Sequence, residues 1–176
     1  MNIKVKVILS ALVSIFLIIP IYIILHECGH SLVAMLCGAK ITKFSVLDAY
    51  MSYEGGTFSL VELALFHAAG MLIPLFVSII YMLIYRTEFT SIPYRIFSFL
   101  FSLVSVFSLI TWVFVPTLYL FGNAPINDDV TKFINSSSIH PMVVMFVASI
   151  ILICCIFIAY NKKIIQYYWS TISTIK

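Results

Sequence analysis

Four long stretches without a charged residue constrain the fold of this 176-residue chain more than any other feature. They run over residues 7–25, 63–85, 96–126 and 142–160. The hydrocarbon core of a bilayer, roughly 30 Å thick, is crossed by a helix of about 20 residues, so each stretch is long enough to span it. The sequence therefore predicts an all-α polytopic membrane protein, a single membrane domain over residues 1–176 with four transmembrane helices at about 7–36, 60–85, 96–121 and 141–160.

The composition excludes the common soluble classes. Hydrophobic residues make up 62% of the chain and charged residues 10%, against roughly 45–50% and 25% in soluble domains. So few charges cannot cover the surface of a soluble enzyme, a coiled coil or a nucleic-acid-binding domain. We therefore expect the chain to be surrounded by the lipid bilayer and to bind no nucleic acid.

Two segments outside the predicted spans have patterns of their own. The loop over about 38–58 begins with alternating polar and apolar residues, the period of a strand, and Glu54-Gly55-Gly56 gives a turn signal near its end. It predicts a short membrane-associated β-hairpin after the first helix. The tail, residues 161–176, mixes Lys with Ile, Tyr and Trp, which favours a segment at the membrane interface.

The distribution of basic residues predicts the orientation. An even number of spans puts both termini on one side of the membrane, with seven basic residues there and three on the other side: Lys4, Lys6, Arg86, Arg95, Lys162, Lys163 and Lys176 against Lys40, Lys43 and Lys132. Because loops rich in Lys and Arg stay in the cytoplasm, we expect cytoplasmic termini.

The end of the first span contains the residues best suited to chemistry, His26-Glu27-Cys28-Gly29-His30. Residues four apart project from the same face of a helix, so His26 and His30 can bind one Zn²⁺. Glu27 lies beside them, where it can accept a proton from a water that zinc acidifies. This is the H-E-x-x-H pattern of zinc hydrolases. A charged residue inside a membrane segment costs roughly 2.5–3.5 kcal/mol on insertion scales, which favours a functional role over an ordinary interfacial one.

A catalytic zinc takes three protein ligands, so the third must come from elsewhere in the chain. The third predicted span ends on the same side as the motif, and Asp128 and Asp129 follow it. We expect Asp129 to be the ligand, with Asp128, near the start of the next helix, as the alternative. The other interpretation of this pair is a simple N-cap of the fourth span, where the helix dipole favours Asp.

Two further residues are candidates for supporting the site. His67 lies inside the second span, and an intramembrane histidine indicates function by default. It could hydrogen-bond an oxyanion or support the metal ligands, or simply be a buried histidine satisfied by a backbone carbonyl. Asn127 could donate to an oxyanion, although loop capping is the commoner role of such a residue.

Three segments together resemble the site-2 protease family of intramembrane zinc metalloproteases. They are the motif over 26–30, the segment Gly38-Ala-Lys-Ile-Thr-Lys-Phe-Ser, and Ala69-Gly70-Met-Leu-Ile-Pro74. The resemblance covers about residues 20–135 and is to a small, divergent member without a PDZ domain. It implies a membrane-embedded motif helix followed by a short sheet. It also implies one zinc ion held by His26, His30 and Asp128 or Asp129, and Glu27 as the general base.

The chain departs from the family in two respects. The aspartate of the family usually lies in an Asn-Pro-x-Pro-Asp-Gly-like stretch, whereas here Asn123 and Pro125 precede Asp128 at a looser spacing and no glycine follows. The best-known members also place their site towards the cytoplasm, opposite to the side that the charge count of this chain gives.

The function expected from the sequence is that of an intramembrane zinc-dependent endopeptidase. Its substrates would be membrane proteins, cleaved in transmembrane or juxtamembrane segments, with Glu27 as the base. The alternative is a non-catalytic membrane binding protein or an inactive homologue of that family. A haem carrier is a poorer interpretation, because two histidines on one helix face cannot bind an iron from opposite sides.

Overall fold

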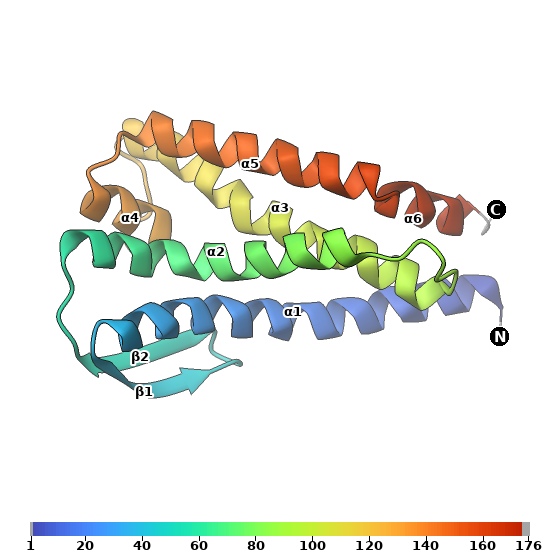
Figure 1. Cartoon of the computed structure of the whole chain (residues 1–176), viewed down its shortest axis with the longest axis horizontal. Helices are drawn as coiled ribbons and strands as arrows, with labels where there is room; N and C mark the ends of the chain where they lie inside the picture. The colour runs from blue at the N-terminus through green and yellow to red at the C-terminus, as the bar shows by residue number, and fades with distance from the viewer. Residues whose placement is uncertain (1, 174–176) are drawn as a thin grey trace.

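The computed structural model describes residues 2–173 and is mostly helical, with a small two-stranded sheet (Figure 1). The elements in chain order are α1 (Ile3–Leu36), β1 (Ala39–Ser45), β2 (Tyr50–Gly55), α2 (Leu60–Ile84), α3 (Ile92–Leu120), α4 (Asp129–Ser137), α5 (Pro141–Asn161) and α6 (Ile164–Ser173).

Four helices, α1, α2, α3 and α5, are long and apolar enough to cross a membrane. This confirms the four helices predicted from the uncharged stretches and is consistent with a multi-pass membrane protein. All four begin before those stretches, and three of them include charged residues there: Lys4 and Lys6 in α1, Glu62 in α2 and Arg95 in α3. The bounds differ because an uncharged stretch shows only which residues can lie in the hydrocarbon core. A helix extends beyond that core for as long as its backbone hydrogen bonds continue.

The helix ends follow local capping chemistry. Ser59 and Glu62 form a capping box at the start of α2, in which each side chain accepts a hydrogen bond from the other residue's backbone N–H. Glu62 therefore completes the start of this helix. At α5 a single hydrogen bond caps the helix, in which Nδ1 of His140 accepts from Met142 N. Gly38, with φ of 82°, follows the last turn of α1, where a left-handed residue lets the chain turn into β1.

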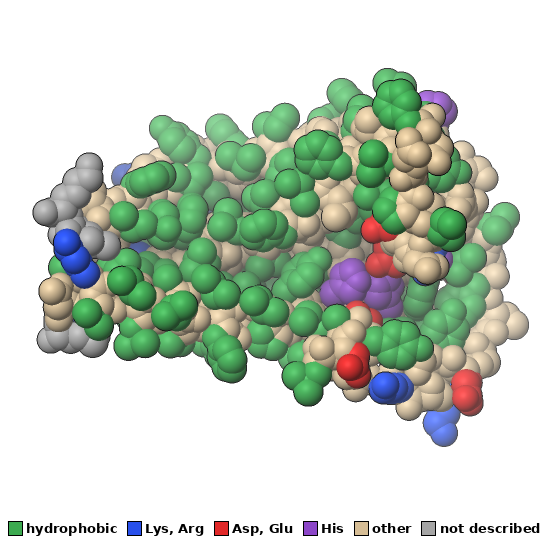
Figure 2. Space-filling view, turned by 180° about the vertical axis from the view of Figure 1, so that it is seen from behind, with side chains coloured by type: hydrophobic (Ala, Val, Ile, Leu, Met, Phe, Trp, Pro, Cys, Tyr) green, Lys and Arg blue, Asp and Glu red, His purple; other side chains and the backbone are tan. Residues whose placement is uncertain are grey.

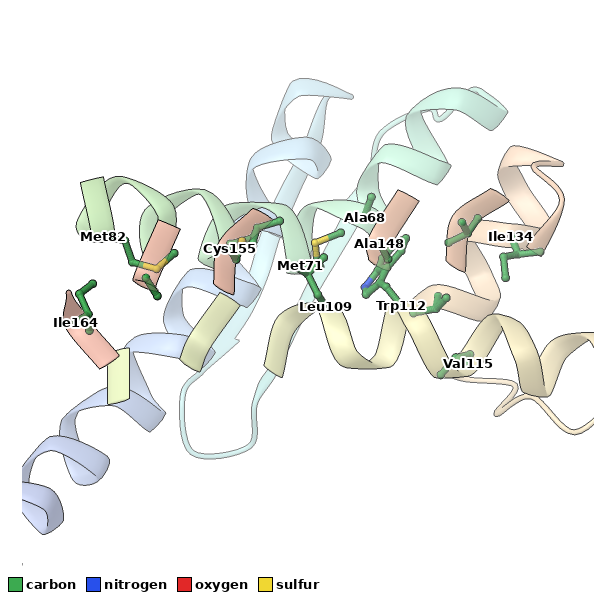
Figure 3. Close-up of a cluster of buried hydrophobic side chains, with 14 of the residues drawn as sticks. Ala68, Met71, Met82, Leu109, Trp112, Val115, Ile134, Ala148, Cys155 and Ile164 are labelled. Carbon is green, nitrogen blue, oxygen red and sulfur yellow. The ribbon is translucent and has the colours of Figure 1, made fainter. Parts of the chain in front are cut away.

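The long helices pack as a bundle around a shared apolar core. α1 lies against α2 and α3, and α5 lies along α3, while α4 packs on α2 (Figure 1). The core is formed mainly by α2, α3 and α5, and its central side chains interdigitate between these helices (Figure 3): Met71, Met82, Leu109, Trp112, Ala148 and Cys155. This packing fixes the positions of α2 and α4 relative to each other.

The predicted hairpin is present. β1 and β2 pair in antiparallel fashion from Ala39↔Gly55 to Ser45↔Tyr50, with a register irregularity between Ile41 and Lys43. A small apolar cluster of Ala34, Ala39 and Met51 seats the hairpin against the end of α1. Whether it contacts a membrane stays a prediction.

Two regions contain more structure than the sequence predicted. The helix start expected at Asp128 is present, but it begins the separate nine-residue helix α4 and not the fourth span. The expected interfacial tail forms α6, in which Tyr168 stacks on Phe99 of α3 at 3.8 Å between ring centroids. Residues 174–176 of that tail lie outside the described residues.

The outer surface of the long helices is strongly apolar. Phe16 and Phe146 have 79% and 64% of their surface exposed, and hydrophobic side chains cover the middle of the molecule in Figure 2. Lys and Arg side chains lie near its two ends in that view. A contiguous apolar surface of this kind is typical of contact with lipid.

Candidate metal centre

Three side chains from two distant parts of the chain converge in the half of the bundle away from the termini. Nε2 of His30 lies 3.2 Å from Nε2 of His26 and 3.1 Å from Oδ2 of Asp129. Nε2 of His26 lies 3.4 Å from the same carboxylate oxygen. These three residues could hold a metal ion. In Figure 2 a group of histidine side chains, with acidic side chains beside it, reaches the surface between hydrophobic ones.

Backbone contact with α2 fixes which nitrogen of His30 faces the cluster. Nδ1 of His30 donates a hydrogen bond of 2.7 Å to the carbonyl oxygen of Phe66. Nδ1 therefore carries the ring hydrogen, and Nε2 presents a lone pair in the neutral tautomer. Oδ2 of Asp129 also presents lone pairs, so a proton or a metal ion must lie between these atoms. This is the tautomer that a metal-ligating histidine needs.

Close contact between α1 and α2 brings the ligands together. A Cβ added to Gly29 would overlap the carbonyl group of Ala69, and one added to Gly70 would overlap the rings of His30 and His26. Glycine at these two positions therefore lets the motif turn of α1 lie directly on the backbone of α2.

The two adjacent aspartates have different roles in the structure. Asp128 is the N-cap of α4 and accepts a hydrogen bond of 2.8 Å from Val130 N. Asp129, in the first turn of α4, faces the histidines instead. Burial alone would raise the pKa of Asp129, but its contacts with the imidazoles outweigh burial and hold that pKa below the usual range of a carboxyl group. The structure thus brings Asp129, and not Asp128, to the cluster.

Glu27, the expected base, is buried on α1 with 6% of its surface exposed. Its carboxylate makes no hydrogen bond or ion pair with any residue in 2–173. Its oxygens are not among the enclosed polar atoms that lack a partner in the described residues, so the carboxylate remains accessible although most of the side chain is buried. The side chains of His26 and Asp129 are 27% and 28% exposed, so the cluster is open on one side.

The two candidate supporting residues differ in position. His67 is buried on α2, and its Nδ1 lies 3.6 Å from Oδ1 of Asp129. The alternative interpretation, in which a backbone carbonyl satisfies the buried histidine, does not hold at Nδ1 of His67. This atom has no hydrogen-bond partner in the described part of the chain. Asn127 is exposed in the loop before α4 and makes no side-chain hydrogen bond within residues 2–173.

The sequence interpretation missed Tyr22, one turn before His26 on α1. The two rings lie 5.9 Å apart between centroids, so Tyr22 adjoins the cluster on its side nearer the termini. The spacing of four residues before the first histidine is the signal that could have found it.

Comparisons with protein-family models, with curated proteins and with solved structures give no match for this chain.

Proposed function

We propose that this chain is an integral membrane, zinc-dependent endopeptidase that cleaves transmembrane or juxtamembrane segments of membrane proteins, in the manner of the site-2 protease family that its motifs resemble. The observation that carries the proposal is the convergence of His26, His30 and Asp129 at the helix turn that also carries the largely buried residue Glu27. Three protein ligands with an open side are typical of a catalytic rather than a structural zinc site.

The geometry of the cluster favours zinc. A tetrahedral zinc ion with bonds of about 2.0–2.1 Å places its ligands about 3.3 Å apart. The separations here are 3.1, 3.2 and 3.4 Å. Two imidazole nitrogens and one carboxylate oxygen are also donors that zinc accepts. We propose one zinc ion per chain.

The depth of the cluster supports cleavage within a membrane. His67, which faces Asp129, lies seven residues into α2, which is about 10 Å along a helix axis. His26 lies ten residues before the end of α1, or about 15 Å. His26 and His67 therefore lie within the apolar helices α1 and α2, short of their ends, and Asp129 of α4 meets them there.

The residues of this chain divide the chemistry between them. When bound, zinc supplies Lewis acidity that polarises a peptide carbonyl and acidifies a water. Glu27 would accept a proton from the water whose oxygen adds to the carbonyl carbon, and would pass it to the amide nitrogen as the C–N bond breaks. A helical substrate segment must unwind first, because its carbonyls are already hydrogen-bonded. Each strand of the hairpin has an unpaired edge on which such an extended segment can add.

The test uses the purified full chain in lipid vesicles with a pooled library of tagged single-span polypeptides, and detects new termini by mass spectrometry. Glu27→Gln should retain about one zinc per chain and lose cleavage by at least 10²- to 10⁴-fold, the usual contribution of a general base. Glu88→Gln, at an exposed position of the loop between α2 and α3, is the matched control and should cleave like the wild type.

Three outcomes would contradict the proposal in different ways. Undiminished cleavage by Glu27→Gln would remove Glu27 as the base. If the purified wild-type chain contained no metal, the proposed zinc site would be contradicted. A wild-type chain that binds zinc but cleaves no member of the library would favour the non-catalytic alternative.

A further inference from the structure

The two oxygens of Asp129 have different surroundings. Oδ2 faces Nε2 of both His26 and His30, at 3.4 and 3.1 Å. Oδ1 instead faces the second span, where Nδ1 of His67 lies 3.6 Å away. Only one of the two oxygens is therefore directed to the place where a metal ion would lie.

His67 is suited to hold the second oxygen. Its side chain is 11% exposed, and its Nδ1 has no hydrogen-bond partner among residues 2–173. A buried donor without a partner is unfavourable, and Oδ1 of Asp129 is an acceptor within a few tenths of an ångström of hydrogen-bond distance. A small rotation of either side chain closes this gap.

The same turn of α2 supports a second ligand. The carbonyl oxygen of Phe66, the residue before His67, accepts the Nδ1 hydrogen of His30. Two consecutive residues of one helix thus contact ligands from two other elements, α1 and α4. Such outer contacts fix the orientation of metal ligands and typically change metal affinity by 10- to 100-fold.

We propose that His67 is a positioning residue of the metal site, which donates from Nδ1 to Oδ1 of Asp129 and so presents Oδ2 alone to the metal. This inference rests on the zinc site of the proposed function, though not on proteolysis. The role matters because Asp129 stands on a short helix, and a free carboxylate could rotate away from the histidines or bind through both oxygens. His67 is then the link through which α2 sets the geometry of a ligand on α4.

The experiment measures zinc affinity of the purified full chain in detergent by competition with a chromophoric chelator. His67→Phe keeps a ring but removes the donor, and should weaken zinc binding by 10- to 100-fold. His67→Asn places an amide nitrogen near the position of Nδ1 and should restore affinity to within a few-fold of the wild type. His140→Phe, which removes an exposed histidine at the start of α5, should leave affinity unchanged.

Cobalt in place of zinc adds a spectroscopic readout that a purely structural role would not predict. The visible absorption of Co²⁺ reports its ligand set, so His67→Asn should keep the wild-type bands while His26→Ala should not. If the phenylalanine variant does not fold, His67→Ala gives the same comparison without added bulk.

The outcomes separate this inference from the proposed function. A wild-type chain that binds no zinc would overturn both. A wild-type chain that binds zinc, with His67→Phe of equal affinity, would overturn only the role of His67. A failure of His67→Asn to restore affinity, with cobalt bands altered as in His26→Ala, would make His67 a direct ligand and would also overturn the positioning role.

Discussion

At the scale of single residues, the clearest division of labour is between two neighbouring aspartates. Asp128 satisfies a backbone N–H at the start of α4, whereas Asp129 faces the two histidines. An N-cap at position 128 fixes where the helix begins, and this sets the direction of the next side chain. Asp128 therefore sets where α4 begins, and this position of the helix start directs the Asp129 side chain towards the histidines.

This division predicts opposite effects of two alanine substitutions. Asp129→Ala should abolish stoichiometric zinc binding, because only two ligands remain. Asp128→Ala should keep zinc and destabilise the chain by about 0.5–2 kcal/mol, the usual cost of losing an N-cap. Metal analysis and thermal unfolding of the two purified variants, side by side, check this. Loss of zinc in Asp128→Ala with retention in Asp129→Ala would reverse the assignment.

At the scale of elements, the contact between α1 and α2 controls the site. The motif turn of α1 lies on the backbone of α2 at Ala69 and Gly70, with no side chain in between. Helices in membranes approach so closely only where small residues line the contact. The distance between the ligands on α1 and the supporting residues on α2 is therefore set by a backbone contact. A backbone contact cannot adjust by a rotamer change, as a contact through a flexible side chain could.

We therefore expect Gly29→Ala to push the two helices apart. Overpacking typically costs about 1–3 kcal/mol, and here the obstacle is the carbonyl of Ala69, so Tm should fall by several degrees and zinc affinity should fall with it. Cys28→Ala, a change at the neighbouring exposed position, is the control. Equal Tm and zinc affinity in both variants would show that the helices do not approach this closely.

Sequence patterns predicted some elements well because those patterns are local. The spans follow from missing charges, the strands from alternation, and the pair His26 and His30 from a spacing of four. The sequence indicated a helix start at Asp128, but not that this helix ends at Ser137 and is separate from the fourth span. The contact of His67 with Asp129 joins residues 62 positions apart, and only packing determines it.

At the scale of the whole molecule, the two ends of the bundle differ in charge and in content. Both termini lie at one end, while the hairpin and α4 lie at the other (Figure 1). Six described basic residues accompany the termini: Lys4, Lys6, Arg86, Arg95, Lys162 and Lys163. The metal-ligand cluster lies towards the opposite end, so the orientation of the chain decides which side of a membrane the cluster faces.

The excess of basic residues predicts that the termini face the cytoplasm. In a background with the four native cysteines replaced by alanine, Thr87→Cys in the loop between α2 and α3 should react with a membrane-impermeant maleimide only after cells are permeabilised. Glu54→Cys in the hairpin should react in intact cells. The reverse labelling pattern would place the cluster on the cytoplasmic side, as the resemblance to site-2 proteases implies. It would also show that the six basic residues near the termini do not determine the topology of so apolar a chain.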